Sequence, residues 1–254
     1  MILNEFDLDK DAVINPNDII EPIEGFPELV VSCFSRVTFG RMLESYDSVQ
    51  FATVSFANLL VPVYKIKYKD VDIGLVNAYV GAAGSVALFE ELTAMGMKKL
   101  VVFGTCGVLD SSINQTSIII PTAAIRDEGT SYHYSPASDE IEVNTAILPQ
   151  LIGYLKDKSI SFTLGKVWTT DAFYRETKKK VLKRKQSGCI AVDMECSALA
   201  AFAQFRNIEL IHFFYAADNL DTEVWDARSL SNHHSIEEKD VIASVALDIA
   251  YTIL

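Results

Sequence analysis

The stretch Val192-Asp193-Met194-Glu195-Cys196-Ser197-Ala198-Leu199 joins a short apolar run to an apolar helix, and it decides the fold. The preceding run, residues 189–192, has the length of a strand, and residues 194–205 are rich in Ala, Leu and Phe. A second run, residues 210–217, is hydrophobic enough for a strand that is buried on both faces. The order strand, helix, strand indicates an α/β fold.

Two carboxylates stand at the ends of these predicted strands. Glu195 lies where the first strand turns into the helix, and Asp218 directly follows the second strand. In open α/β sheets, ligands bind outside the carboxyl ends of the strands. A buried carboxylate costs several kcal/mol unless a partner compensates its charge. Together, Glu195 and Asp218 therefore indicate a site for a polar ligand.

The same alternation of strands and helices continues along the rest of the chain. Further strands are expected at residues 29–34, 71–79, 99–103, 117–121 and 161–168. Helices are expected at residues 36–46, 86–95 with Ser85 as N-cap, 144–155, 178–185 and 235–254. We predict one α/β domain over residues 1–254, a three-layer sandwich whose central mixed, twisted sheet has helices on both faces, with residues 1–28 as an irregular N-terminal extension.

Composition excludes several classes of partner. The chain has 254 residues, and its net charge of −12 argues against a general affinity for nucleic acid or an anionic membrane. No apolar run is long enough to span a bilayer, and the first residues lack the pattern of a secretory signal. The four cysteines form no CxxC pair, so no disulfide and no metal site are expected. We expect a cytoplasmic protein that binds neither nucleic acid nor membrane.

Three further segments carry residues that are suited to a ligand. Gly104-Thr105-Cys106-Gly107 follows a predicted strand and can aim backbone N–H groups at an anion, or can form only a tight turn. Phe173 and Tyr174 can offer an aromatic face to a planar base, or can pack in the core. Residues 126–134 are polar and aromatic, as in a pocket border or a surface loop. His212 lies inside an apolar strand and is interpreted as a core residue.

Taken together, these segments resemble the nucleoside phosphorylase superfamily, which includes hexameric purine nucleoside phosphorylase, uridine phosphorylase and the methylthioadenosine nucleosidases. The resemblance runs from about Val30 to the C-terminal helix. It is carried by four segments in a specific order and spacing, namely residues 104–107, residues 126–132, residues 170–174 and residues 192–195 with Asp218.

The resemblance implies a role for each candidate residue. Glu195 would accept hydrogen bonds from the 2′ and 3′ hydroxyls of ribose, with Met194 against the sugar. Asp218 would be the catalytic acid that protonates N7 of a purine, a group that uridine phosphorylases lack. The base site would comprise Phe173, Cys106, Gly107 and Asn219. The phosphate site would comprise Arg36, Thr105 and Gly104. No cofactor is implied beyond inorganic phosphate as co-substrate, and the partners are a nucleoside, phosphate and further copies of the chain in a dimer or hexamer.

The chain departs from the phosphorolytic pattern around the phosphate. The Arg that precedes the Gly-Thr-Cys-Gly segment in such enzymes is replaced by Val102. Their early glycine-rich loop is replaced by Val31-Ser32-Cys33-Phe34, and the Arg that a neighbouring subunit usually supplies has no clear counterpart near residues 56–58. Guanidinium groups grip phosphate through paired hydrogen bonds, so their loss matters.

Three hypotheses follow. The first is a purine nucleoside phosphorylase that yields free base and ribose 1-phosphate. The second is a nucleosidase with water in place of phosphate, and the third is a non-catalytic nucleoside-binding relative. Asp218 argues against the third, because binding alone needs no proton donor. Arg228 can close over the site or remain at the surface.

Overall fold

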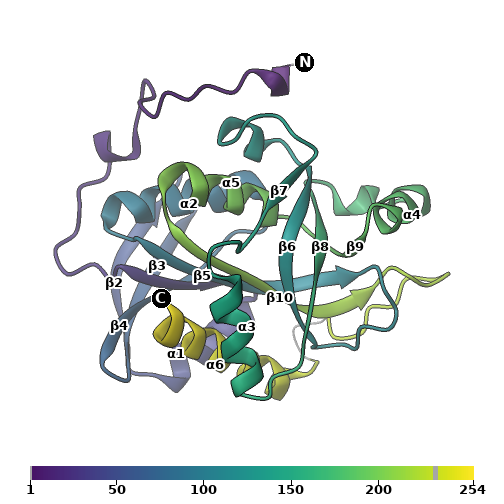
Figure 1. Ribbon diagram of the computed structural model, residues 1–254. Helices are drawn as coiled ribbons and strands as arrows, with labels where there is room; N and C mark the ends of the chain where they lie inside the picture. Colours follow the sequence, from purple (N-terminus) through teal and green to yellow (C-terminus); the bar gives the residue numbers. More distant parts are fainter. Residues whose placement is uncertain (1, 231–233) are drawn as a thin grey trace.

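The computed structural model describes residues 2–230 and 234–254, which form a ten-stranded mixed sheet and six α-helices (Figure 1). The strands are β1 (Leu29–Cys33), β2 (Ser48–Ser55), β3 (Leu60–Tyr68), β4 (Val71–Asn77), β5 (Lys99–Val108), β6 (Ile118–Asp127), β7 (Glu140–Glu142), β8 (Phe162–Thr170), β9 (Cys189–Asp193) and β10 (Glu209–Asn219). The helices are α1 (Arg36–Ser45), α2 (Ala82–Met95), α3 (Leu148–Asp157), α4 (Lys178–Gln186), α5 (Cys196–Arg206) and α6 (Ile236–Ile253). None of the helices in the described ranges combines the length and apolarity that crossing a membrane requires.

The sheet is mixed, as predicted, but part of it also closes on itself. Its strand order is β10-β6-β8-β9-β5-β1-β4-β3-β2, with β7 beside β6. Because β10 also pairs with β5, the strands β5, β9, β8, β6 and β10 form a closed ring. Within that ring the β5–β10 pair is parallel and the β5–β9 pair is antiparallel. Closure brings the ends of β9, β5 and β10 side by side.

Helices cover both faces of the sheet, which confirms the predicted layers (Figure 1). On one face, α1, α3 and α6 pack on alternate strand residues such as Val31, Phe103 and Phe213. On the other, α2 and α5 pack on the intervening residues, such as Val30 and Val102. Successive side chains of a strand point to opposite faces, so a continuous apolar run serves both layers.

Two local predictions were wrong. The run from Lys99 does not end in a glycine turn, because β5 continues through Gly104 and Gly107 to Val108. Neighbouring side chains fill the space that these glycines leave, with Phe34 over Gly104 and Leu220 over Gly107, so strand pairing outweighs the low strand propensity of glycine. Ser85 is not an N-cap either, since α2 begins earlier, after Gly81. Its hydroxyl instead donates to the backbone carbonyls of Tyr79 and Gly81.

His212 is a core residue, as the sequence predicted, and burial of its polar ring destabilises the folded state. The side chain is fully buried, and neither ring nitrogen has a hydrogen-bond partner within the described residues. Burial lowers the pKa of His212 to about 3. The unfolded chain therefore takes up this proton at a higher pH than the folded chain does, so the folded state loses stability as pH falls from about 6.5 towards 3.

We expect His212→Leu to raise the melting temperature, and to raise it more at pH 5 than at pH 7. The gain at neutral pH should be about 1–3 kcal/mol, because two unsatisfied buried nitrogens are removed. The gain should grow in acid, since leucine binds no proton. Thermal unfolding at the two pH values measures both effects, with His133→Gln at the exposed His133 as the control. An equal shift at both pH values would contradict the titration of His212.

Candidate active site

The predicted pair of carboxylates lies where three strands meet. Gly107 of β5 pairs with Val192 of β9 on one side and with Asp218 of β10 on the other. Val192 and Asp218 are thus two strand spacings apart, about 10 Å between their backbones. The glycine between them lets both neighbours approach, since a Cβ there would lie 3.2 Å from Asp218 Oδ1 and 3.2 Å from Val192 Cγ1. Glu195 follows three residues after Val192.

Asp193 holds the turn that presents Glu195, a role that sequence reasoning missed. Its Oδ2 accepts hydrogen bonds from the backbone N–H groups of Glu195 (2.8 Å) and Cys196 (2.6 Å). Its Oδ1 accepts one from the Thr169 hydroxyl at 2.8 Å. Burial raises the pKa of Asp193 to about 6, although these donors oppose the shift. An acidic residue just before an apolar helix is the signal that sequence analysis could have used.

Glu195 is buried and points at the beginning of α2. Its Oε1 accepts a hydrogen bond of 2.5 Å from the backbone N–H of Gly81, whose φ of +107° lies in the region that favours glycine. Burial, and then the nearby charge of Asp193, raise the pKa of Glu195 to about 8. A buried carboxyl with one fixed donor has acceptor capacity left for further hydroxyl groups.

Asp218 is half-buried at the end of β10. The Trp225 indole N–H donates to its Oδ2 at 2.7 Å. Burial is the main effect on this carboxyl and raises its pKa, while the Trp225 hydrogen bond works in the opposite direction. A raised pKa is what a carboxyl group needs to carry a proton near neutral pH.

Glu176 is a further acid near this site that the sequence did not single out. It lies between Arg175 and α4, and burial followed by the charges of Asp218 and Asp193 raises its pKa to about 7. Four carboxyl groups with raised pKa values therefore surround the ends of β9 and β10. Such clusters are typical of functional sites.

The polar stretch at residues 126–134 is hydrogen-bonded to the beginning of α5, the helix that follows Glu195. Glu128 is buried, and its two oxygens accept from the Ser197 hydroxyl of α5 and from the Ser131 backbone N–H, both at 2.9 Å. The buried Arg126 donates to the Ser131 hydroxyl at 2.8 Å and to the Pro136 carbonyl at 2.6 Å. These bonds hold the segment after β6 against the beginning of α5.

The predicted base-site residues occupy different environments. Phe173 is 47% exposed and packs on Tyr174 with ring centroids 4.0 Å apart, so it is available at the surface rather than in the core. Cys106 is buried beside Asp218. Asn219 is buried, and its amide bonds the Ser111 hydroxyl and the Asp221 N–H. Asn219 therefore holds the following loop, and its contact with a base stays a prediction.

The residues predicted to bind phosphate lie beyond the end of β1 and in the middle of β5. Arg36 is exposed at the first position of α1, after the N-cap Ser35, and Thr105 is half-exposed on β5. Cys33, the last residue of β1, pairs with Phe103 in parallel register, so Gly104 and Thr105 of β5 extend past the end of β1. The Phe34 ring lies against Gly104, with Cδ2 2.7 Å from the place of a glycine Cβ. An apolar ring thus stands where the resemblance predicts anion contacts, and Val102 is buried in the core.

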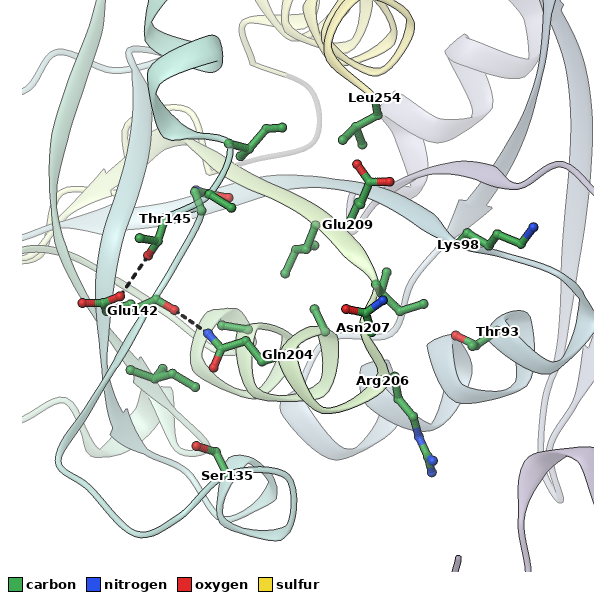
Figure 2. Close-up of a pocket in the computed structure, with 18 of the residues that line it drawn as sticks. Thr93, Lys98, Ser135, Glu142, Thr145, Gln204, Arg206, Asn207, Glu209 and Leu254 are labelled. Carbon is green, nitrogen blue, oxygen red and sulfur yellow. Dashed lines mark hydrogen bonds between the residues drawn. The ribbon is translucent and has the colours of Figure 1, made fainter. Parts of the chain in front are cut away.

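A cavity of about 1040 Å³ lies away from the candidate site (Figure 2). It lies by the beginning of β10, at Glu209 and Leu210, about 30 Å along the strand from Asp218. Figure 2 shows that wall groups bond one another, as where the Gln204 amide donates to the Glu142 carbonyl at 3.0 Å. In the described ranges, no group of three or more His, Cys, Asp or Glu side chains is arranged to hold a metal ion.

Comparisons with known proteins agree with this fold. The family model described as the phosphorylase superfamily matches residues 28–250. Guanosine phosphorylase of Halorubrum lacusprofundi is 26% identical over 148 residues, 57% of this chain and 61% of that protein. A DeoD-type purine nucleoside phosphorylase of Shewanella oneidensis is 29% identical over 139 residues, 54% of this chain and 59% of its own length. These matches span about three fifths of the two relatives.

A solved structure extends the likeness of fold over nearly the whole chain. Uridine phosphorylase of Vibrio fischeri superposes with a TM-score of 0.75 over 92% of this chain and 94% of its own, at 19% identity. At that identity the likeness concerns the fold alone.

Proposed function

The chain belongs to the phosphorylase superfamily, and from this premise we propose that it cleaves the N-glycosidic bond of a purine nucleoside with phosphate, giving free base and ribose 1-phosphate. One observation carries the proposal. A buried carboxyl, Glu195, follows the end of β9, and a second carboxyl with a raised pKa, Asp218, lies at the end of β10; both strands pair with β5 at Gly107. The sugar and the base of one nucleoside can each contact one of these two carboxyl groups.

Glu195 serves the sugar. Cleavage builds positive charge on the ribose, so the reaction needs the sugar held firmly and its hydroxyls polarised. Glu195 accepts one hydrogen bond from Gly81 N–H and keeps free lone pairs for the 2′ and 3′ hydroxyls. Asp193 fixes the backbone of Glu195, so this acceptor needs little reorganisation when the nucleoside binds.

Asp218 serves the base. The leaving purine accumulates negative charge, and protonation at N7 relieves it. A general acid of this kind contributes about 10²- to 10⁴-fold. Asp218 has the raised pKa that this task needs, and its Oδ1 lies beside Gly107. Phe173, exposed near this edge, is the proposed stacking partner of the base.

Phosphate is the proposed nucleophile, with Arg36, Thr105 and backbone N–H groups as its ligands. The second candidate function is hydrolysis, and a specific observation favours it. Phe34 packs on Gly104, and Val102 replaces an expected Arg. Both changes remove donors from the place where phosphate would bind, whereas water needs fewer of them.

We expect release of base from inosine, adenosine or methylthioadenosine to depend on inorganic phosphate. The protein is incubated with each nucleoside, with and without phosphate, and the sugar product is identified by chromatography and mass spectrometry. A sugar 1-phosphate supports phosphorolysis. Free sugar at the same rate without phosphate would replace the first function by the second. Binding of nucleosides without any cleavage would contradict both proposed functions.

Assembly and location remain proposals that rest on the family. We propose a homo-oligomer, a dimer or a hexamer, with active sites at subunit boundaries, in the cytoplasm. Sedimentation or light scattering measures the assembly.

A further inference from the structure

Trp225 is hydrogen-bonded to Asp218 although it is largely exposed to solvent. Its indole N–H donates to Asp218 Oδ2 at 2.7 Å, yet 58% of the residue is exposed. The loop that carries it is pinned to the end of β10, since Asn219 N–H donates to Asp226 O (2.8 Å) and Asp226 N–H donates to Asn219 O (3.2 Å). Arg228 ties down the next turn through its hydrogen bond to the Ile113 carbonyl at 2.8 Å. Trp225 is therefore held over Asp218 by the backbone on its C-terminal side.

This contact gives the two oxygens of Asp218 different surroundings. Oδ2 is engaged by the indole, and Oδ1 lies beside Gly107, 3.2 Å from the place of a Cβ. The Leu220 side chain fills the space that Gly107 leaves, so Oδ1 lies beside Gly107 and Leu220, and it is the oxygen that the indole leaves unengaged. The N–H donor on Oδ2 also restricts the rotation of the carboxyl group, and with it the direction of Oδ1.

We propose that Trp225 is a positioning residue for the general acid, holding the Asp218 carboxyl so that Oδ1 faces the base, and that it sets the upper pH limit of the reaction. The proposal rests on the proposed function. It adds a role for Trp225, which acts through Asp218 and needs no contact with the nucleoside.

The pH effect follows from what an N–H donor does to a carboxyl group. A donor stabilises the ionised form, so the Trp225 bond holds the pKa of Asp218 below the value that burial alone would give. The other groups that face Asp218 are Arg228 and Asp226 on the loop, Glu176 before α4 and the Cys106 thiol of β5. Replacing Trp225 leaves those groups in place, so the change isolates the indole N–H.

Trp225→Phe, which keeps a ring and removes the N–H, provides the test. We expect the alkaline limb of the kcat/KM profile to move up by about one pH unit or more, because a hydrogen bond to a charged group is lost. At the plateau, kcat should fall by about tenfold with little change in KM, because the acid is less well oriented. Val224→Ala is the matched control, because Val224 is the exposed neighbour on the same loop, and it should move neither quantity. An alkaline limb that stays in place in Trp225→Phe overturns the proposal.

A second readout needs no turnover. Ionisation of Asp218 should change the fluorescence of the Trp225 indole that is bonded to it, whereas Trp168, fully buried and bonded to Asp127, gives the same background in every variant. A pH titration of the protein without nucleoside should show a transition that is absent from Trp225→Phe and from Asp218→Asn. Persistence of that transition in Trp225→Phe overturns the coupling. A wild-type protein that shows the transition but cleaves no nucleoside refutes the proposed function and leaves the contact established.

Discussion

Asp218→Asn should lower kcat for purine nucleoside cleavage by about 10²-fold or more and leave nucleoside binding almost unchanged. The substitution is nearly isosteric, and the asparagine oxygen can still accept the hydrogen bond that Trp225 donates to Oδ2. What is lost is the proton that the leaving base takes up. Because that proton moves only as the bond breaks, the loss should fall on the chemical step.

Single-turnover kinetics and equilibrium binding of a nucleoside separate these two quantities. Glu223→Gln removes a carboxylate from the exposed surface of the same loop and serves as the control for charge. Unchanged single-turnover rates in Asp218→Asn would remove this residue from the mechanism. An equal loss in the Glu223 variant would attribute the effect to the charge of the loop rather than to a proton donor.

The sequence predicted the two principal carboxylates because their positions follow from local pattern. Glu195 stands between an apolar run and an apolar helix, and Asp218 closes a second apolar run. The rule that strands present ligands at their carboxyl ends then marks both as candidate site residues. It does not place them at one edge, because β9 runs antiparallel to β5 and β10 runs parallel to it. That the two segments lie on either side of Gly107 depends on the pairing of β9 and β10 with β5, which local pattern does not specify.

The parts that sequence analysis missed depend on contacts between distant residues. Trp225 reaches Asp218 only because a loop folds back through Asn219 and Asp226. Glu176 becomes part of the acidic cluster only because the segment before α4 approaches β10. Gly104 and Gly107 look like a turn in the sequence, yet Phe34 and Leu220 pack over them and keep β5 extended. In each case tertiary packing outweighs the local signal.

Packing around Glu195 also explains why this carboxyl, the proposed ribose ligand, costs the protein stability. The group is buried, and its pKa is raised to about 8, so the surroundings disfavour the negative charge. Hydroxyls of a bound ribose would supply the donors that the ionised form lacks. The same side chain should therefore weaken the folded protein alone and strengthen its complex with a nucleoside, an exchange that is common at functional sites.

Glu195→Gln should separate the two effects. Binding and kcat/KM for ribonucleosides should fall by about 10- to 100-fold, because hydrogen bonds to a charged acceptor become neutral ones. The loss should be smaller for 2′-deoxynucleosides, which lack one of the two hydroxyls. Equal losses for both substrate classes would contradict contact with the 2′ hydroxyl. The Gly81 hydrogen bond should survive, because the amide oxygen still accepts it.

Glu195→Gln should raise the stability of the folded protein, whereas it should weaken the binding of ribonucleosides. The folded pKa of about 8 lies above the ordinary value of 4.5, so the stability that goes with the protonated carboxyl is complete below about pH 4.5 and is lost as pH rises through 8. Each unit of that shift corresponds to about 1.4 kcal/mol. Glutamine cannot ionise, so the variant should melt above wild type by a margin that widens from about pH 5 to pH 8 and then levels off. Thermal unfolding across this range measures the margin, with Glu223→Gln as the exposed control. A constant margin would mean that Glu195 does not titrate there, and its carboxylate would then be available to ribose without a change of protonation.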